Sequence, residues 1–176
     1  MRTILRHSVI ACVLVLCAAS CRAELTGHTH DFDAMYRAST LTLTGNKYGE
    51  ASIPPVLAYQ GDGGGVFAYE SSLYVVKLAN SGSTIETLSA VEDLTRIEIL
   101  RNSTTDTSLE FYISDDGETW TKVTEGIKAV SYSMEVPMPA KGNYWIKIKR
   151  TTSSAINILS VTYYTDPCNC LRVVTE

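Results

Sequence analysis

Two histidines and two aspartates near the N-terminus, in the segment GHTHDFD, are the first residues whose types could do chemistry. His28 and His30 stand at alternate positions, so an extended backbone would project both side chains to the same side. Imidazoles arranged in this way are ligands for a transition metal. The segment precedes the first clear strand pattern, however, and chain termini are usually poorly ordered. We therefore interpret it as a solvated arm, with a metal site as the alternative.

The rest of the sequence contains few groupings that support catalysis. A hydrolase needs a nucleophile beside a base, or two positioned carboxylates, and no GxSxG, HExxH or Walker sequence is present. Three consecutive glycines, at positions 63–65, could approach a phosphate, but neither a helix pattern nor a Lys-Ser/Thr pair follows them. We read them as a hairpin or bulge. The prediction is a protein that is not an enzyme, with a small hydrolase as the least favoured alternative.

The segment SDDGETW, which ends at Trp120, predicts a β-hairpin beside an aromatic side chain. Gly117 can take the positive φ that tight hairpin turns require. A two-residue loop would set Asp115 opposite Glu118 and send Trp120 into the core. A three-residue loop would set Tyr112 opposite Trp120 on the other, more polar face. We favour the three-residue loop because it keeps like charges apart.

A second tryptophan, Trp145, lies in the alternating segment NYWIKIK. Alternation sends Ile146 and Ile148 to one face, so Trp145 shares the other face with Lys147 and Lys149. Its ring would either contact a ligand or lie across lysine stems or beneath a neighbouring loop. For Trp120, the alternative to ligand contact is packing at the edge of the core. The predicted ligand-binding residues are Trp145, Trp120, Tyr112 and Lys147.

The elements that must position these residues are short strands. Apolar residues recur at every second position through most of the chain after about residue 38, which predicts strands with one buried face. Turn-forming segments rich in Gly, Pro, Asn and Ser, such as GNKYGE and MPAKGN, separate them. About nine or ten antiparallel strands at this spacing predict an all-β sandwich of the jelly-roll type. The predicted strands cover residues 39–44, 66–69, 73–79, 83–88, 94–100, 108–113, 129–136, 143–149 and 156–164.

Residues 94–164 resemble the second half of galactose-binding-like jelly rolls, which include discoidin-type modules, many carbohydrate-binding modules and related modules of secreted Bacteroidetes proteins. The shared elements are a strand ending in IEIL, the SDDGETW hairpin, the aromatic-rich segment GNYWIKIK and the final strand INILSVTYY. The resemblance implies a noncatalytic β-sandwich that binds sugars or surfaces through loops at one end. It also implies a structural calcium ion near the chain ends, for which Asp31, Asp33 and Asp166 offer oxygen ligands. No other cofactor is expected.

The N-terminal residues predict export. Two arginines precede an apolar run over about residues 9–19 that ends in small residues, which is the layout of a secretory signal. We assign residues 1–20 to this signal, with cleavage before Cys21 or before Glu24. The sequence AASC resembles a bacterial lipoprotein box, so a lipid on Cys21 would tether the chain to the outer membrane or cell surface. Cleavage before Glu24 would instead release a secreted protein.

The remaining chain is long enough for one domain. We assign residues 21–37 to an N-terminal arm, 38–166 to the β-sandwich and 167–176 to a C-terminal tail. The tail contains Cys168 and Cys170, which form a strained disulfide or stay as thiols, since two thiols alone make a poor zinc site. The net charge falls from -4 to -6 when the signal and its two arginines are removed, and an acidic domain does not suggest a nucleic-acid partner.

These observations predict a secreted or lipid-anchored, noncatalytic binding module, with carbohydrate as the leading ligand class. Aromatic rings near turns offer flat apolar faces to the C–H groups of sugars. The alternative partner is an envelope protein, contacted by a structural or adhesion subunit through exposed strand edges. In both cases the membrane is reached only through a lipid anchor.

Overall fold

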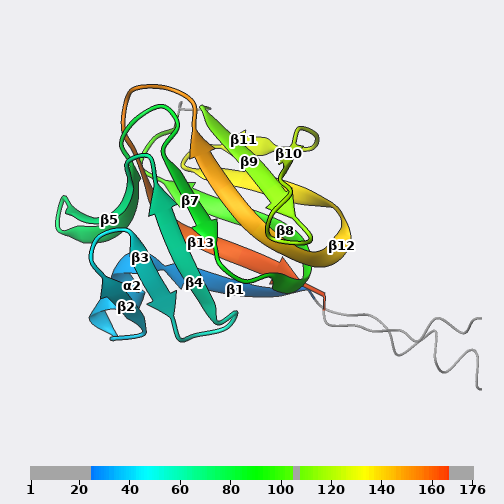
Figure 1. Cartoon of the computed structure of the whole chain (residues 1–176), viewed down its shortest axis with the longest axis horizontal. Coiled ribbons are helices and arrows are strands. Elements are labelled where there is room, and N and C mark those ends of the chain that lie inside the picture. The colour runs from blue at the N-terminus through cyan, green and yellow to red at the C-terminus, as the bar shows by residue number, and fades with distance from the viewer. Residues whose placement is uncertain (1–24, 105–107, 167–176) are drawn as a thin grey trace, which may run out of the picture.

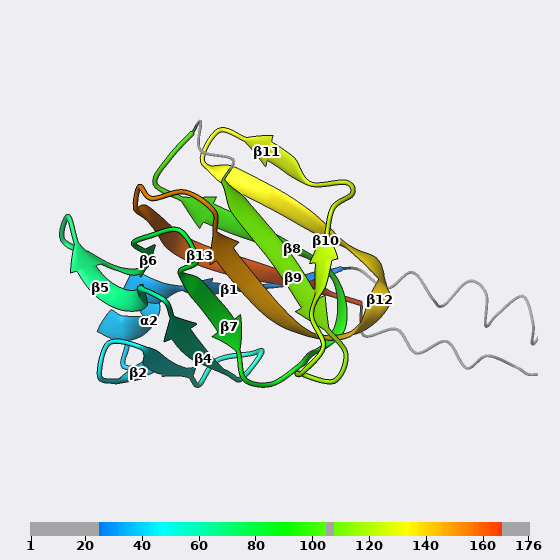
Figure 2. The ribbon, with the colours of Figure 1, turned by 45° about the horizontal axis from the view of Figure 1, so that its top comes forward.

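The computed structural model describes residues 25–104 and 108–166 of the 176-residue chain. Within them the regular structure is thirteen strands and one six-residue helix, α2 (Phe32–Arg37). The strands pair antiparallel and form two layers that face each other (Figures 1 and 2). The all-β sandwich predicted from alternation is confirmed. No helix in the described residues is long and apolar enough to cross a membrane.

One layer, which we call sheet A, contains the C-terminal strand at its centre. β13 lies between β8 on one side and, on the other, β6 beside its first residues and β1 beside its last residues. The chain ends of the described domain therefore lie side by side, as Figure 1 shows. Sheet A is made of β1 (Thr26–Asp31), β5 (Gly65–Glu70), β6 (Leu73–Leu78), β8 (Val91–Arg101), β11 (Lys128–Val130), the first part of β12 (Ser133–Arg150) and β13 (Ile156–Thr165).

The second layer, sheet B, carries the predicted ligand-binding residues. Its strand order runs from β2 through β3, β4, β7 and the last part of β12 to β9 and β10. The short strands β3 and β10 were not predicted, because β3 begins in a segment that was read as a turn and β10 has only three residues, too few to display a period of two. Sheet B is made of β2 (Leu41–Thr44), β3 (Tyr48–Ala51), β4 (Leu57–Asp62), β7 (Thr84–Thr87), β9 (Leu109–Ser114), β10 (Thr121–Val123) and the end of β12.

The long strand β12 belongs to both sheets. Its first residues pair with β8 in sheet A, and its last residues pair with β7 and β9 in sheet B. The register shifts between Pro137 and Gly142 and again between Gly142 and Tyr144. The segment MPAKGN was expected to be a turn between two strands, but it is the irregular stretch where one strand passes from sheet A to sheet B. Proline and glycine interrupt the ladder there without reversing the chain.

The interior of the sandwich contains a buried chain of polar groups as well as apolar side chains. The carbonyl of Pro54 can only accept, so His30 Nε2 donates to it over 3.3 Å. His30 Nδ1 then accepts from the hydroxyl of Tyr59 at 2.5 Å, and Tyr59 accepts from Tyr163 at 2.9 Å. Burial lowers the pKa of His30 and raises the pKa of Tyr59. All three side chains are therefore held neutral inside the protein.

The predicted N-terminal arm over residues 21–37 is wrong for the residues that the structure describes. β1 pairs with β13 along its whole length, and Phe32 and Met35 of α2 are in the core. His30, interpreted as solvated, is fully buried. The sequence concealed this because the one buried side chain of β1 is polar, and because α2 is too short to display a helical period.

Candidate functional site

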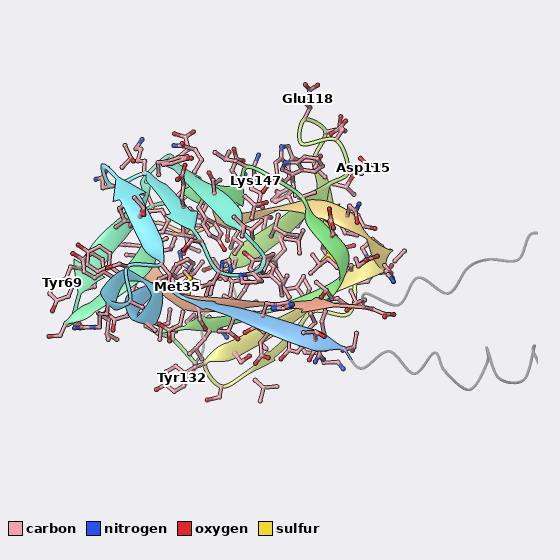
Figure 3. The ribbon with its side chains drawn as sticks, turned by 90° about the horizontal axis from the view of Figure 1, so that it is seen from below. Met35, Tyr69, Asp115, Glu118, Tyr132 and Lys147 are labelled. Carbon is pink, nitrogen blue, oxygen red and sulfur yellow. The ribbon has the colours of Figure 1, made fainter. Side chains whose placement is uncertain are left out.

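The four predicted ligand-binding residues lie together on the surface of sheet B that faces away from the core. In the register of this sheet Lys147 lies opposite Tyr112, and Trp145 lies opposite Ser114. Trp120 immediately precedes β10, on the side of the hairpin that carries Tyr112. Figure 3 shows Lys147 on the same side of the molecule as the loop that follows β9.

This surface extends across sheet B as a row of aromatic and charged side chains. The row is continuous because each residue is the cross-strand partner of the next, and such neighbours lie about 5 Å apart. We call this surface the outer face of sheet B. From β10 to β3 its row consists of Lys122, Tyr112, Lys147, Glu86, Gln60 and Tyr48.

Trp120 and Lys147 form the centre of the outer face. The ammonium nitrogen of Lys147 lies 3.8 Å from the centroid of the Trp120 ring, which is a cation–π contact. The same nitrogen lies 2.8 Å from a carboxylate oxygen of Glu86. Lys147 is thus fixed by an indole and a carboxylate at once, and Trp120 is partly exposed beside it. This arrangement places an aromatic ring next to a fixed donor and a fixed acceptor.

A second set of interactions holds the neighbouring side chains of β9 and β10. Lys122 Nζ lies 2.6 Å from one oxygen of Glu110, and the Tyr112 hydroxyl donates to the other oxygen at 2.7 Å. The hydrogen bond from Lys122 lowers the pKa of Glu110, so its carboxylate stays ionised over a wide pH range. The ring of Tyr112 is consequently held in one orientation beside Lys147.

The hairpin that presents Trp120 has a longer loop than either predicted form. Ile113 pairs with Thr121, so Ser114 faces Trp120 across a five-residue loop. The favoured three-residue loop is therefore wrong in register, but Trp120 lies on the face that it predicted. The reason is that the observed register differs from the favoured one by two residues, and side chains alternate with a period of two.

The loop over residues 115–119 is stabilised by Asp116 rather than by a tight turn. Its carboxylate accepts from the backbone nitrogens of Glu118 at 2.8 Å and Thr119 at 2.7 Å, and from the hydroxyl of Ser114 at 2.8 Å. These hydrogen bonds hold the pKa of Asp116 well below its usual range. The ordered loop projects beyond the sheet at Asp115 and Glu118 (Figure 3).

Trp145 lies beneath this loop. A Cβ atom built on Gly117 would be 3.2 Å from Cε2 of the Trp145 indole, so the glycine rests directly on the ring. Gly117 has a φ of +78°, which explains why glycine occupies this position. Of the alternatives considered for Trp145, the structure shows the one in which its ring lies under a neighbouring loop. Trp145 therefore supports the loop that carries Trp120.

Four members of the row on the outer face are absent from the predicted ligand-binding residues, namely Lys122, Tyr48, Gln60 and Glu86. Tyr48 was hidden because GNKYGE was read as a turn, although β3 begins within it. Gln60 was hidden because β4 was not predicted. Glu86 lies in a predicted strand, and its outward direction follows from the buried neighbours Ile85 and Thr87. Its place opposite Lys147 depends on the pairing of β7 with β12, which alternation alone does not give.

The three aspartates predicted to hold calcium do not come together. Asp31 lies opposite Ser160 at one end of the pairing between β1 and β13, whereas Asp166 follows Thr165 at the other end. Asp33 instead forms an ion pair within α2. Among residues 25–104 and 108–166, no group of three or more His, Cys, Asp or Glu side chains is placed to hold a metal ion. Cys21, Cys168 and Cys170 lie outside the described residues.

A pocket of about 430 Å³ opens on the other side of β10, between that strand and the middle of β12. Its walls include Ile113, Val123 and Met138, and the amine of Lys122 at its rim is held by Glu110. The lining also contains the polar side chains of Thr121, Thr124 and Glu125, but none of its residues has an aromatic ring that could stack on a sugar. We therefore place the candidate site on the outer face of sheet B.

No protein-family model matches the sequence, and no curated protein matches it. Solved structures with similar folds include a family two carbohydrate esterase from Cellvibrio japonicus, with 11% identity over 81% of this chain and a TM-score of 0.43. This chain spans 34% of that esterase chain. A low-affinity xylan-binding module from Roseburia intestinalis has 10% identity, a TM-score of 0.42 and coverage of 80% of this chain and 94% of its own.

A further xylan-binding module has 14% identity, a TM-score of 0.37 and coverage of 69% of this chain and 97% of its own. The similarity is one of fold.

Proposed function

We propose that this chain is a noncatalytic carbohydrate-binding module whose ligand lies along the outer face of sheet B. The observation that carries the proposal is the arrangement around Trp120, where a partly exposed indole adjoins Lys147, and Lys147 in turn adjoins Glu86 and Tyr112. A sugar ring offers an apolar C–H face and a rim of hydroxyls. An aromatic ring suits the former, and a fixed ammonium and carboxylate suit the latter.

The fixed geometry of these groups favours binding. Lys147, Lys122 and Tyr112 are each held by carboxylates, so little side-chain freedom is left to lose when a ligand arrives. The row from Lys122 to Tyr48 crosses six strands, a span of roughly 24 Å at the usual strand spacing. That span suits several sugar units of an extended chain better than a single monosaccharide.

Affinity electrophoresis against soluble xylan, mannan, mixed-linkage glucan and galactan tests this function. We expect at least one polysaccharide to retard the wild type, and Trp120→Ala to lower the affinity about tenfold or more, because truncating an aromatic anchor typically costs over 1 kcal/mol. Tyr132→Ala is the control, since Tyr132 is 50% exposed and lies on the opposite side of the molecule from Lys147 (Figure 3).

Equal retardation of the wild type and Trp120→Ala would place the ligand elsewhere. Retardation by none of the four polysaccharides would contradict the function. Lys147→Met sharpens the result, because it removes the fixed donor while leaving the apolar stem of the side chain.

We further propose that the module acts outside the cytoplasm, tethered by a lipid on Cys21. The support is the basic and apolar N-terminal sequence followed by AASC. Membrane fractionation of a bacterial host that expresses the full chain and Cys21→Ser checks this proposal. The wild type is expected in the membrane fraction and the variant in the soluble exported fraction, and a wild type that begins at Glu24 would contradict lipidation.

A further inference from the structure

Three tyrosine rings gather at the end of the molecule formed by α2 and the β5–β6 hairpin. Tyr36 stacks on Tyr74 with ring centroids 3.5 Å apart and 25° between the planes, and Tyr69 is tilted with its centroid 5.1 Å from that of Tyr74. Tyr69 is 60% exposed and Tyr36 is 38% exposed. We call these residues the tyrosine cluster. Figure 3 shows Tyr69 at the end of the molecule away from the loop that carries Glu118.

Two of these rings lie past the edge of the core, although strand alternation puts them on the inward-facing side of the hairpin. Phe67 and Tyr69 point to the same side of β5, and their partners across the hairpin are Val76 and Tyr74. Phe67 is 6% exposed and belongs to the core, whereas Tyr69, two residues further on, lies past its edge. At that edge α2 supplies Tyr36 as the neighbour of Tyr74. The inward-facing side of the hairpin thus extends past the edge of the core, where its aromatic rings are exposed.

The hairpin turn beside the cluster is held in an unusual conformation. Ser71 and Ser72 have φ values of +51° and +70°, which two-residue hairpin turns normally assign to glycine or asparagine. Arg37 of α2 donates to the carbonyl of Ser72 at 3.0 Å and to Asp33 at 2.7 Å. Asp33 in turn accepts from the backbone nitrogen of Tyr74 at 3.0 Å. The helix therefore fixes the turn, and with it the positions of the exposed rings.

We propose that the tyrosine cluster is a second saccharide-binding surface, separate from the outer face of sheet B. The proposal rests on the carbohydrate-binding function proposed above and adds a site to it. Its rings offer faces for the C–H groups of a sugar, and the guanidinium of Arg37, which is held by Asp33 and by the carbonyl of Ser72, offers donors for hydroxyls.

The size of the cluster favours a saccharide over a protein partner. A stable protein interface takes about 800 Å² from each partner and some 20 residues, whereas three rings and a few flanking side chains match one or two sugar units. Two surfaces at separate parts of one domain would bind a polysaccharide at two points or link two chains. Binding to long chains would then exceed binding to short oligosaccharides through effective concentration.

The two sites can be measured separately because both tryptophans of the chain, Trp120 and Trp145, belong to sheet B. Tryptophan fluorescence reports the outer face, while calorimetry reports all binding. The ligands are the polysaccharide that retards the wild type most strongly in the four-member panel and a hexasaccharide prepared from it. The variants are Tyr69→Ala, Trp120→Ala and the matched exposed tyrosine control Tyr132→Ala, each checked for folding by circular dichroism.

We expect Tyr69→Ala to lower the calorimetric stoichiometry for the hexasaccharide from two to one and to weaken polysaccharide binding about tenfold or more. The fluorescence titration of that variant should match the wild type, and Tyr132→Ala should change neither readout. Trp120→Ala should abolish only the outer-face binding, leaving one calorimetric site.

The wild type could bind one hexasaccharide, with that binding abolished in Trp120→Ala and unchanged in Tyr69→Ala. This result would overturn the second site, while the proposed function would stand. A single site lost in Tyr69→Ala and kept in Trp120→Ala would support the tyrosine cluster and overturn the outer face. The wild type could instead self-associate with increasing concentration, and Tyr69→Ala could remove this self-association without changing glycan binding. The cluster would then bind a second copy of the chain, and the proposal would be overturned. A wild type that binds no polysaccharide overturns both sites.

Discussion

The outer face of sheet B and the interior beneath it contain similar side chains in opposite situations. Outside, Trp120 meets Lys147 and Glu86, which are charged and in contact with water. Inside, Tyr59 and Tyr163 meet His30, and all three are buried and neutral. The comparison shows that the same aromatic and polar residue types form an internal framework where water is excluded and a surface open to a ligand where it is not.

The difference has a physical basis in the cost of burying charge. An unpaired buried charge is costly, so the interior keeps its polar groups uncharged and bonds them in a chain. On the outer face water screens the charges, so each ion pair contributes little to stability. Groups that are not needed for folding can serve a ligand. Mutations should therefore separate the two regions, with stability lost from one and binding lost from the other.

The greatest loss of stability is expected from a substitution in the interior. Tyr163→Ala should lower the free energy of unfolding by about 3–5 kcal/mol, because it truncates a fully buried aromatic side chain. Trp120→Ala should lower it by no more than about 1 kcal/mol, as expected for a partly exposed cation–π contact. Urea unfolding of both variants gives the comparison. If Tyr163→Ala fails to fold, Tyr163→Phe removes only the hydroxyl and should still cost about 1–2 kcal/mol.

Equal losses of unfolding free energy in Tyr163→Ala and Trp120→Ala would contradict the difference between the two regions. They would mean that the outer face belongs to the stabilising framework and is a poor candidate for ligand binding.

Trp145 lies between the two regions, and an intermediate effect is expected there. Trp145→Ala should destabilise the protein by about 2 kcal/mol, less than a core aromatic and more than an exposed one. Gly117→Ala tests the contact itself, since its new Cβ would press on the indole at 3.2 Å. Gly45→Ala is the matched control, because Gly45 has a similar φ of +66° and no atom within 4 Å of a built Cβ.

Gly117→Ala should therefore cost more than Gly45→Ala, and the excess should vanish when Trp145 is also alanine. Equal costs at both glycines would show that the loop does not rest on Trp145. The measurement is urea unfolding of the single and double variants.

The smallest expected effect is the pH dependence of the interior. Burial lowers the pKa of His30 in the folded protein, while the unfolded chain has the ordinary value of about 6.5. Below pH 6.5 the imidazole of His30 therefore binds a proton in the unfolded chain that it does not bind in the folded protein. The contribution of neutral His30 to the free energy of unfolding should be fully present above about pH 6.5. It should fall as the pH decreases toward the folded pKa, by at most about 1.4 kcal/mol per pH unit.

Urea midpoints measured from about pH 7.5 to about pH 5.5 check this slope around the ordinary histidine pKa. His30→Gln should reduce this slope. A wild type with constant stability across this range would contradict the neutral, buried assignment of His30.

Several features of the outer face could be predicted because they depend on alternation alone. Tyr112 and Lys147 point outward because their neighbours in sequence point inward, whichever strands they pair with. Trp120 was expected on this face despite a wrong loop length, since a shift of two residues restores the same side. The tyrosine cluster was harder to predict from the sequence. Tyr69 and Tyr74 face the core side of the hairpin, and only the position of the core edge leaves them exposed.

Other features depended on contacts between distant segments. β1 appeared to be a solvated arm because its only buried side chain, His30, is polar, and its burial depends on Tyr59 and Tyr163 far along the chain. The calcium prediction failed because it assumed that Asp31 and Asp166 meet, whereas the antiparallel pairing of β1 with β13 separates them.

The all-β class, most of the strands and the outward side chains of the predicted strands could be read from the sequence, because a period of two is a local property of the backbone. Which strands are neighbours became clear only from the folded protein, where strand pairing places Glu86 beside Lys147 and the turn at Gly117 over Trp145. Strand order and register arise from packing the two faces into one core, and no short segment contains that information.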